Sequence, residues 1–549
     1  MHRKIWLSVA MAAVGAGCLL AAAFASPASS KPLKPAAGVQ KKGGTMNVNM
    51  SGTDVDFTDP ALAYGTLSWE IEYATCAMLL SYVDKPAPEG SKLIPEVATA
   101  LPTVSKDGKT YTFKLKNTYK FNTGQTVTAA NFAAAINRDL NPKMQSPVVA
   151  FIGNIVGAQA VIDGKAATAS GVIAKGNTLT VKLTQPDGGF LAKIAMPFFC
   201  AIPTNLPIDA NGVSTLPGAG PYYIASRQVG RNIVVKRNPN YNGPRPHNVD
   251  TFNITVNTNL DQSLLQVKSG QVDWDMGGLP PTAHAELGEQ FGVNKSRYFV
   301  HPLVETDYIA LNTSRPAFSN VNMRKAANWA VDRPALLRLR GKYAGKRTDQ
   351  VLPPGMGGFR DVTIYPLKGS NYAKAKDYAA KGGGCKDVTL YAASTAFGQA
   401  VAQVFKYNLS QLGCNVSVKL FQGFQIYVAA GTKGEPFDAA FAGWNQDYPD
   451  PYDFIDILLN GDNIHDANNN NLAYLNVPAL NKRMAAANKL TGAARYKAYG
   501  DLDVDITKNY APWAAYDNRN DREFVAARVG GVVFQPAYAT LDLATFFLK

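Results

Sequence analysis

The sequence lacks the short motifs that mark common hydrolases and nucleotide-dependent enzymes. Its 549 residues contain no HExxH, no GxSxG, no Walker-type phosphate loop and no GxGxxG after a predicted strand. Only five histidines occur, and no two form a close pair. Zinc hydrolysis, serine hydrolysis and dinucleotide chemistry are therefore disfavoured. We expect no catalytic residue, cofactor or metal site; the oxygen-rich run at 462–471 lacks the spacing and closing glutamate of an EF-hand.

Long runs of a single charge are also missing. The formal net charge is +14, but no five consecutive Lys or Arg residues occur and no arginine-rich tract alternates with aromatics. Nucleic acid is therefore not an expected partner. A hydrophobic content of 46% with 17% charged residues describes a folded globular protein. The length corresponds to about three or four domain-sized units.

Long apolar runs are absent except at the N-terminus. His2-Arg3-Lys4, the apolar segment 5–22 and Ala23-Phe24-Ala25 have the order of a signal peptide that is cleaved after residue 25. Residues 26–43 are rich in Pro, Ala, Ser and Lys and are expected to form a tether. The sequence therefore predicts an exported protein. Lipid attachment at Cys18, after a weak lipoprotein-like box, is the alternative to removal of that cysteine.

Cysteines are few, and no CxxC occurs among them, so zinc ribbons and thioredoxin-like sites are not expected. An even number of cysteines in an exported chain indicates disulfides. Three pairings are open in principle. Apart from Cys18, the chain contains Cys76, Cys200, Cys385 and Cys414.

Two of these cysteines flank a predicted strand–helix–strand unit. Strand patterns at 388–392 and 415–420 enclose a helical pattern at 398–412, which predicts two neighbouring parallel strands. Cys385 and Cys414 each come just before one of these strands, so their starts should lie side by side. This arrangement favours a bond between these two cysteines.

Apolar periodicity predicts the remaining elements. Expected strands are 45–50, 110–115, 179–183, 232–236, 512–516 and 532–534. Expected helices are 67–82, 129–140, 323–339 with a break at Pro334, 374–380, 480–490 and 494–506.

The stretch from Phe437 to Pro451 has the strongest signature of a ligand site. Alternating residues 437–442 predict a short strand that ends at Gly443. Trp444 follows, and two prolines at 449 and 451 then enforce a stiff loop. The strand tip would present an indole, free backbone N–H groups and a carboxylate, which suit a ligand with an apolar part and a positive end. A surface loop with a half-buried Trp is the alternative.

Several segments, in order along the chain, resemble the extracytoplasmic solute-binding proteins of peptide/nickel-class ABC importers. The resemblance spans nearly the whole mature chain. It rests on GGTMNV at 43–48, DFTDPALA at 56–63, KDGKTYTFKLKNTYKFNTGQTVTAANF at 106–132, GAGPYYI at 218–224, KRNPNY at 236–241, LLQVKSGQVDW at 264–274, LNTSRPAFSNVNMRKAANWAVDR at 311–333 and GWNQDYPDP at 443–451.

This resemblance implies an α/β, two-lobe periplasmic-binding-protein-like fold of type II, in its large peptide-binding class. Lobe I would comprise residues 44–300 and 515–549, with an extra subdomain at about 83–200. Lobe II would comprise residues 301–514. Cys76 and Cys200 would then lie in one lobe at the two borders of the subdomain, which favours their pairing.

The resemblance also implies the binding residues. Asp447 matches the family's aspartate that pairs with the α-ammonium of a peptide. Gly443, Trp444 and Asn445 would supply main-chain contacts. From lobe I, Tyr64 and Thr66 would face them, with Gly278 in a second loop.

The expected function is that of a substrate-binding component, which closes on an oligopeptide by hinge motion and delivers it to a membrane permease. A monomer that is not an enzyme is expected. An oligosaccharide or nickel-chelate binder of the same family is the first alternative, and an exported peptide hydrolase is the second. Aromatic side chains would stack on a sugar or chelate in the first of these.

Overall fold

The computed structural model describes residues 41–549. The predicted signal peptide, Cys18 and residues 26–40 of the predicted tether lie outside the described residues. Lys41, near the end of that tether, forms a bridge to Leu548. Within residues 41–549, no helix combines the length and apolar character needed to cross a membrane.

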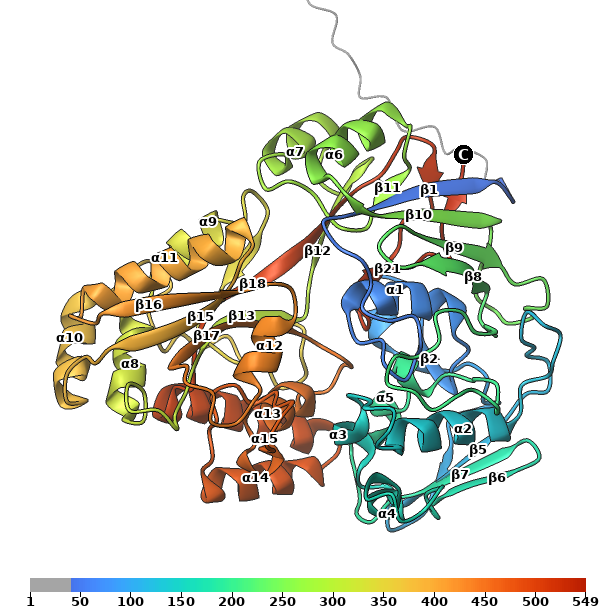
Figure 1. The fold of residues 1–549 in the computed structure, drawn as a ribbon, viewed down its shortest axis with the longest axis horizontal. Coiled ribbons are helices and arrows are strands. Elements are labelled where there is room, and N and C mark those ends of the chain that lie inside the picture. Colours follow the sequence, from blue (N-terminus) through green and yellow to red (C-terminus); the bar gives the residue numbers. More distant parts are fainter. Residues whose placement is uncertain (1–40) are drawn as a thin grey trace, which may run out of the picture. The chain divides into compact units, whose positions relative to one another are not determined.

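One mixed sheet gathers strands from the N-terminal half of the chain (Figure 1). Its order is β11-β1-β10-β9-β8, and β1 pairs in parallel with both of its neighbours. The strands alternate buried and exposed residues, as Thr251–Thr258 does along β10. The bounds are β1 Thr45–Ser51, β8 Tyr222–Gln228, β9 Asn232–Arg237, β10 Thr251–Thr258 and β11 Trp274–Asp275.

A second sheet gathers strands from the C-terminal half. Its order is β12-β18-β13-β17-β15-β16, with β14 also paired to β18. The predicted βαβ unit is confirmed, because β15 and β16 run parallel with α11 between them in the chain. The bounds are β12 Tyr298–Pro302, β13 Glu305–Leu311, β14 Gly345–Arg347, β15 Val388–Ala393, β16 Val416–Phe421, β17 Ala439–Asn445 and β18 Trp513–Phe524.

Strand β18 crosses the predicted border between the lobes. The whole strand pairs within the second sheet, with β13, β14 and β12 in turn. The next residue, Val525, forms a bridge to Trp274 of the first sheet. The division at 300 and 515 therefore stays a prediction, and strands β12 and β18 lie where the chain passes between the two sheets.

A third, four-stranded sheet lies within residues 83–200, the segment expected to form the subdomain. Its order is β4-β5-β7-β6, and helix α2 packs on β6 and β7. Asn131 caps this helix, since its side chain accepts the backbone N–H of Thr128 at 2.8 Å. The bounds are β4 Thr103–Val104, β5 Thr110–Lys114, β6 Val172–Lys175 and β7 Thr178–Lys182.

Helices cover these sheets, as Figure 1 shows for α8–α11 beside β15 and β16. The helices are α1 Thr66–Thr75, α2 Ala129–Leu140, α3 Val149–Ile152, α4 Ala158–Ile162, α5 Phe190–Lys193, α6 Leu260–Ser269, α7 His284–Phe291, α8 Val321–Ala330, α9 Arg333–Arg338, α10 Tyr372–Lys381, α11 Ala396–Ser410, α12 Gln425–Ala430, α13 Tyr452–Leu459, α14 Pro478–Asn488 and α15 Gly492–Asp505. Short paired strands are β2 Leu80–Tyr82, β3 Leu93–Pro95, β19 Val529–Gly530, β20 Phe534–Gln535, β21 Thr540–Leu541 and β22 Phe547–Leu548.

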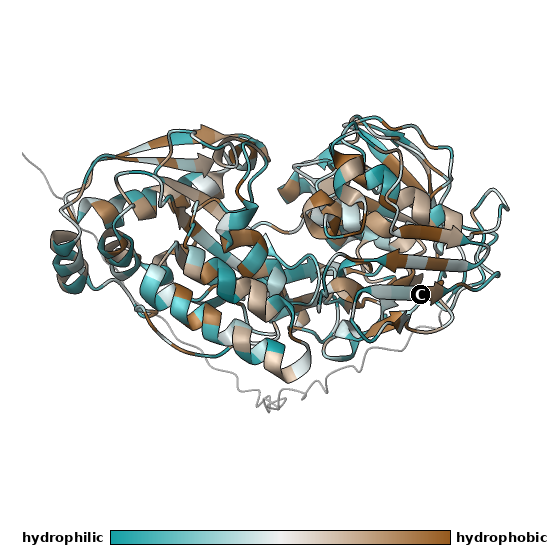
Figure 2. Cartoon of the chain, turned by 90° about the horizontal axis from the view of Figure 1, so that it is seen from below, coloured by the Kyte–Doolittle hydropathy of each residue, from teal (hydrophilic) through white to brown (hydrophobic). Residues whose placement is uncertain are grey.

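Buried apolar side chains form separate cores for the first and second sheets. The brown segments of Figure 2 alternate with teal ones along these elements, as expected for strands and helices with one buried face. A further cluster draws on residues 69–202 and on residues 426–515. Segments far apart in the sequence thus share one apolar core next to the predicted site.

The predicted helix 67–82 is wrong in its second half. Helix α1 ends at Thr75, Cys76 takes an extended conformation, and Leu80–Tyr82 forms strand β2. The run from Cys76 to Tyr82 is buried throughout. A strand that is buried on both faces reads as a continuous apolar run, which periodicity does not distinguish from a helix.

Both predicted disulfides are confirmed. Cys76 is bonded to Cys200, with 5.5 Å between their Cα atoms. Cys385 is bonded to Cys414, with 4.9 Å between Cα atoms, at the starts of the parallel strands β15 and β16.

Candidate functional site

Three of the predicted site residues line one cavity of about 350 Å³. Thr66 begins helix α1, Gly278 follows strand β11, and Asn445 ends strand β17. The cavity therefore collects residues from the first sheet region and from the second. Its other lining residues are Leu67, Glu70, Met276, Gly277, Leu279, His284, Leu303, Arg519, Asn520, Asp521, Arg522, Glu523, Ala539, Thr540 and Leu541.

The loop before α1 is held by Asp56, a residue that sequence reasoning did not assign to the site. Its Oδ2 accepts the backbone N–H groups of Tyr64 and Gly65, each at 2.8 Å. Its Oδ1 accepts the Ser68 hydroxyl. Carboxylates that accept several N–H and O–H groups fix a loop without a regular element. The signal was present, because Asp56 opens the DFTDPALA segment.

The second loop, after β11, depends on two glycines. Gly278 has φ +102°, a left-handed conformation that favours glycine. At Gly277 a Cβ would collide with the backbone of Ser51. The two glycines thus allow this loop to pass close to the end of β1 and to reach the cavity.

Gly443 lies inside a strand rather than ending one, which corrects the sequence prediction. Strand β17 continues through Trp444 to Asn445 and pairs with β13, where Asp307 faces Gly443. The space of a Cβ at Gly443 is taken by the Asp307 carboxylate. The Gly443 N–H donates to the Tyr427 hydroxyl at 3.2 Å, so it is not free as expected.

Asp453 orients the predicted Trp444 and Asp447 together. Its Oδ2 accepts the Trp444 indole N–H at 3.2 Å and the Asp447 backbone N–H at 2.9 Å. Asp453 is fully buried near the start of α13, and its Oδ1 has no partner. Sequence reasoning missed it; its only signal was a third aspartate after Asp447 and Asp450.

Asp447 makes the most direct contact between the two regions. Its Oδ2 accepts the Tyr64 hydroxyl at 2.7 Å, and the Tyr64 and Trp444 rings meet edge to face at 6.4 Å. The side chain is 7% exposed. No Lys or Arg among residues 41–549 forms an ion pair with it. Three predicted residues from distant parts of the sequence therefore form one cluster.

Burial controls the titration of this cluster. It raises the pKa of the Asp447 carboxyl to about 7, although hydrogen bonds from Tyr64 and Asp453 act in the opposite direction. Burial, followed by the negative charge of Asp447, raises the pKa of Asp453 well above its ordinary value. Neither carboxyl is paired with a Lys or Arg of residues 41–549.

Further contacts join residues of the predicted subdomain to the segment that contains α13 and α14. Phe151 meets Tyr448 edge to face at 6.0 Å, and the Lys193 ammonium lies 3.9 Å from the centre of the Tyr452 ring. The Gly188 N–H donates to the Asn488 carbonyl at 3.2 Å. The subdomain sheet region thus packs against helices α13 and α14.

Behind the tip of β17, a buried ion pair anchors the proline-rich loop. Arg495 binds Asp450 through two hydrogen bonds of 2.9 and 2.6 Å, and both side chains are buried. The same guanidinium donates to the Asn488 carbonyl at 2.9 Å. Asp450 therefore serves the loop, and it does not form a carboxylate pair with Asp447.

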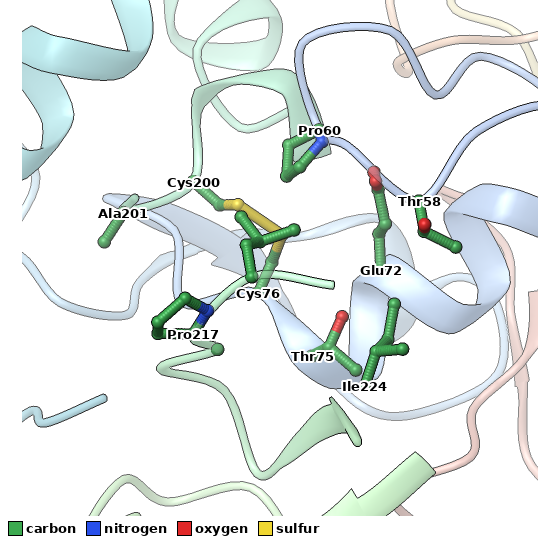
Figure 3. Close-up of a pocket in the computed structure, with 11 residues that line it drawn as sticks. Thr58, Pro60, Glu72, Thr75, Cys76, Cys200, Ala201, Pro217 and Ile224 are labelled. Carbon is green, nitrogen blue, oxygen red and sulfur yellow. A yellow bond between two sulfur atoms is a disulfide. The ribbon is translucent and has the colours of Figure 1, made fainter. Parts of the chain in front are cut away.

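A second, much smaller cavity of about 20 Å³ lies beside the Cys76–Cys200 disulfide. Figure 3 shows Glu72 reaching toward the segment that carries Thr58 and Pro60. Both Glu72 carboxyl oxygens lack a partner, and burial raises the pKa of this carboxyl well above its ordinary value. This space has about the volume of one water molecule and contains none of the predicted site residues.

Across residues 41–549, no cluster of three or more His, Cys, Asp or Glu side chains is arranged to hold a metal ion. The fold defines the class: an α/β protein of the two-lobe solute-binding type.

Comparison with known proteins identifies the family. Residues 92–466 match the bacterial extracellular solute-binding proteins, family 5 Middle. The match covers more than half of the chain, which therefore belongs to this family.

Individual relatives agree with this assignment. The periplasmic oligopeptide-binding protein OppA of Salmonella typhimurium is 27% identical over 541 residues, covering 94% of this chain and 95% of that protein. The solved structure of clavulanic acid biosynthesis oligopeptide binding protein 2 has a TM-score of 0.85 at 22% identity, covering 93% of this chain and 96% of that one. The periplasmic binding protein DppA of Helicobacter pylori, solved with the peptide STSA, has a TM-score of 0.77 at 18% identity, covering 93% and 99%. The expected type II two-lobe fold is confirmed.

Proposed function

We propose that this protein is the extracytoplasmic substrate-binding component of an ABC importer, and that it binds oligopeptides between its two lobes. The observation that carries the proposal is Asp447, a carboxylate that is 7% exposed and lacks a cation at the contact between the two regions. The names of the relatives support the peptide as ligand. The peptide would be handed on unchanged to a membrane permease.

Binding would use the α-ammonium and the main chain of the peptide. Asp447 would accept the ammonium and release the Tyr64 hydroxyl from its 2.7 Å hydrogen bond. Asn445, at the end of β17, and the loops at Thr66 and Gly278 would contact the extended peptide, as in strand addition. A ligand that touches both regions favours closure, because it gains contacts that the open form lacks.

The cellular setting of the proposal follows from the family and the sequence. The chain would be exported, with cleavage after Ala25; lipid attachment through Cys18 is the alternative. It would act as a monomer with the permease as partner, without nucleic acid and without enzymatic activity. Lobe I would hold residues 44–300 and 515–549, with Cys76–Cys200 at its subdomain, and lobe II residues 301–514.

Titration calorimetry with a mixture of short peptides tests the amine anchor. Asp447→Ala is expected to weaken peptide binding by about 2–5 kcal/mol, because a buried charge pair loses one partner. Asp466→Ala, at a fully exposed aspartate, is the control and should bind as the parent does. Equal affinities for the parent and Asp447→Ala would exclude the anchor.

Two further measurements separate the alternatives. Acetylating the peptide N-terminus removes the positive charge, so an amine anchor loses affinity whereas a sugar or nickel-chelate site is indifferent. Incubating peptide with pure protein and recovering it intact argues against a hydrolase, and cleavage would support one.

A further inference from the structure

The cavity of about 350 Å³ carries three acidic side chains that the amine anchor does not use. Glu70 comes from helix α1, whereas Asp521 and Glu523 come from strand β18. The three residues, which we call the acidic wall, are brought together by the fold from opposite ends of the chain. Glu70 and Glu523 are buried, and Asp521 is half-buried.

The partners of the acidic wall are neutral. Glu70 accepts the backbone N–H of Leu541 at 2.9 Å, and Glu523 accepts the Trp274 indole N–H at 2.6 Å. Asp521 and Glu523 are two residues apart on strand β18, so their side chains leave the same face of the strand. No Lys or Arg in the described part of the chain forms an ion pair with any of the three.

Burial without an ion pair affects the pKa of these carboxyls. Burial raises the pKa of all three carboxyls, and the charge of Asp521 raises the pKa of both Glu70 and Glu523 further. Carboxylates that are buried without a cation disfavour their charged form. A bound cation would remove this penalty.

The nearby arginines are already engaged. Arg519 pairs with Glu305, with 2.6 Å between Nε and Oε2. Arg522 donates to the backbone carbonyls of Arg340 and Lys342 at 2.7 and 3.0 Å. Both guanidiniums lower the pKa of Asp521, but neither forms an ion pair with the acidic wall.

Two unpartnered polar atoms in the same cavity point independently to a ligand. His284 is 1% exposed; its Nδ1 contacts the Tyr298 hydroxyl at 3.0 Å, and its Nε2 has no partner. Asn445, at the end of β17, lines the same cavity, and its Oδ1 has no partner. Buried polar atoms usually have a partner in native proteins, and a polar group bound in this cavity would supply one.

We infer that the acidic wall receives a guanidinium or ammonium side chain of the bound solute, so that the protein prefers peptides with a basic residue. This inference rests on the proposed peptide-binding function. A guanidinium suits the wall best, because its planar fork of five donors can reach acceptors on both α1 and β18. The cavity is at the small end of the ~300–1,000 Å³ range of ligand sites, with room for one long side chain.

The test uses calorimetry on the full exported protein and a peptide series on a pentaalanine background. One position at a time carries arginine, lysine, glutamate or citrulline, the last being a neutral isostere of arginine. At one position arginine is expected to bind at least ten times more tightly than citrulline, with lysine between them and glutamate weakest. Glu523→Gln and Glu70→Gln should reduce the arginine-to-citrulline ratio to below threefold.

Glu72→Gln is the matched control, since Glu72 is equally buried on α1 but faces the small disulfide cavity. It should keep the full ratio, and thermal unfolding should show that each variant is folded. If all peptides bind and arginine equals citrulline at every position, the inference is wrong while the proposed function stands. If the variants keep the full ratio, the preference arises elsewhere and the inference is also wrong. If folded protein binds no peptide, the proposed function fails, and the inference with it.

Discussion

Two groups of buried acids differ in what neutralises them. In the loop after β17, Asp450 is paired with Arg495, and Asp447 accepts the Tyr64 hydroxyl. At the cavity, Glu70 and Glu523 accept hydrogen bonds from neutral donors, and no member of the acidic wall forms an ion pair with a described Lys or Arg. Burial of both groups is similar, so burial alone does not mark a binding site. A missing counter-charge marks a candidate only beside a cavity that has room for a ligand, because Glu72 is also buried without a cation but lines a space of about 20 Å³.

The largest effect on stability is expected at Asp450, the buried acid that is paired with Arg495. Arg495→Met leaves Asp450 buried and unpaired, which is expected to lower the free energy of unfolding by about 3–5 kcal/mol. Urea denaturation measures this change. Lys381→Met, which breaks the exposed pair with Asp377, is the control and should cost less than about 0.5 kcal/mol. A small loss of stability for Arg495→Met would show that the proline-rich loop after β17 does not depend on this pair.

The pH dependence of stability reports on buried acids whose pKa is raised. Burial raises the pKa of Asp447, Asp456 and Asp503 to about 7 and of Asp542 to about 8. These folded-state values exceed those of the unfolded chain, so each contribution to stability is full below about pH 4 and is lost as the pH rises through 7–8. The free energy of unfolding should therefore fall between pH 5 and 8.

Asp447→Asn should make this dependence shallower by up to about 1 kcal/mol per pH unit between pH 5 and 7. Chemical denaturation of the ligand-free protein at several pH values provides the measurement. The same dependence in parent and variant would mean that Asp447 does not hold its proton in the folded state.

How much of this could be read from the sequence depends on the kind of signal. The family segments located Asp447 and the loops at Thr66 and Gly278. Periodicity located α2 and the βαβ unit, which supported the Cys385–Cys414 bond. These features follow from local patterns or from segments whose order is known in relatives.

Other features were hidden because a tertiary contact overrides the local pattern. Strand β18 was expected to end at residue 516 but extends to Phe524, because its charged second half pairs with β14 and β12. Gly443 was expected to end a strand, but the Asp307 side chain fills the space of its absent Cβ. The acidic wall joins Glu70 to residues about 450 positions away, a proximity that single-sequence reasoning does not provide.

Substitution in the acidic wall should change the free energy of unfolding in the opposite direction to Arg495→Met. Glu523→Gln keeps an acceptor for the Trp274 indole and removes one of three crowded carboxyls. We expect it to stabilise the ligand-free protein by about 1 kcal/mol at pH 8, as neutral groups often do at sites strained for function. The effect should shrink as the pH falls, because burial raises the pKa of Glu523 and favours its protonated form.

Glu305→Gln is the matched comparison, because Glu305 is buried beside the same cavity but is paired with Arg519 at 2.6 Å. It should destabilise the protein in the same denaturation assay. If both glutamine variants destabilise equally, counter-charge does not distinguish the two environments.

The smallest effect is expected at the contact between the regions. Tyr64→Phe removes only the hydroxyl that donates to Asp447 at 2.7 Å and keeps the ring packed against Trp444. One hydrogen bond contributes about 0.5–1.5 kcal/mol, so the closed ligand-free form should lose about that much relative to an open form. Small-angle scattering of ligand-free protein should then show a larger mean radius of gyration, and saturating peptide should restore the parent value. An unchanged radius without peptide would mean that the apolar contacts of Phe151 and Tyr448 hold the two regions together without the hydroxyl.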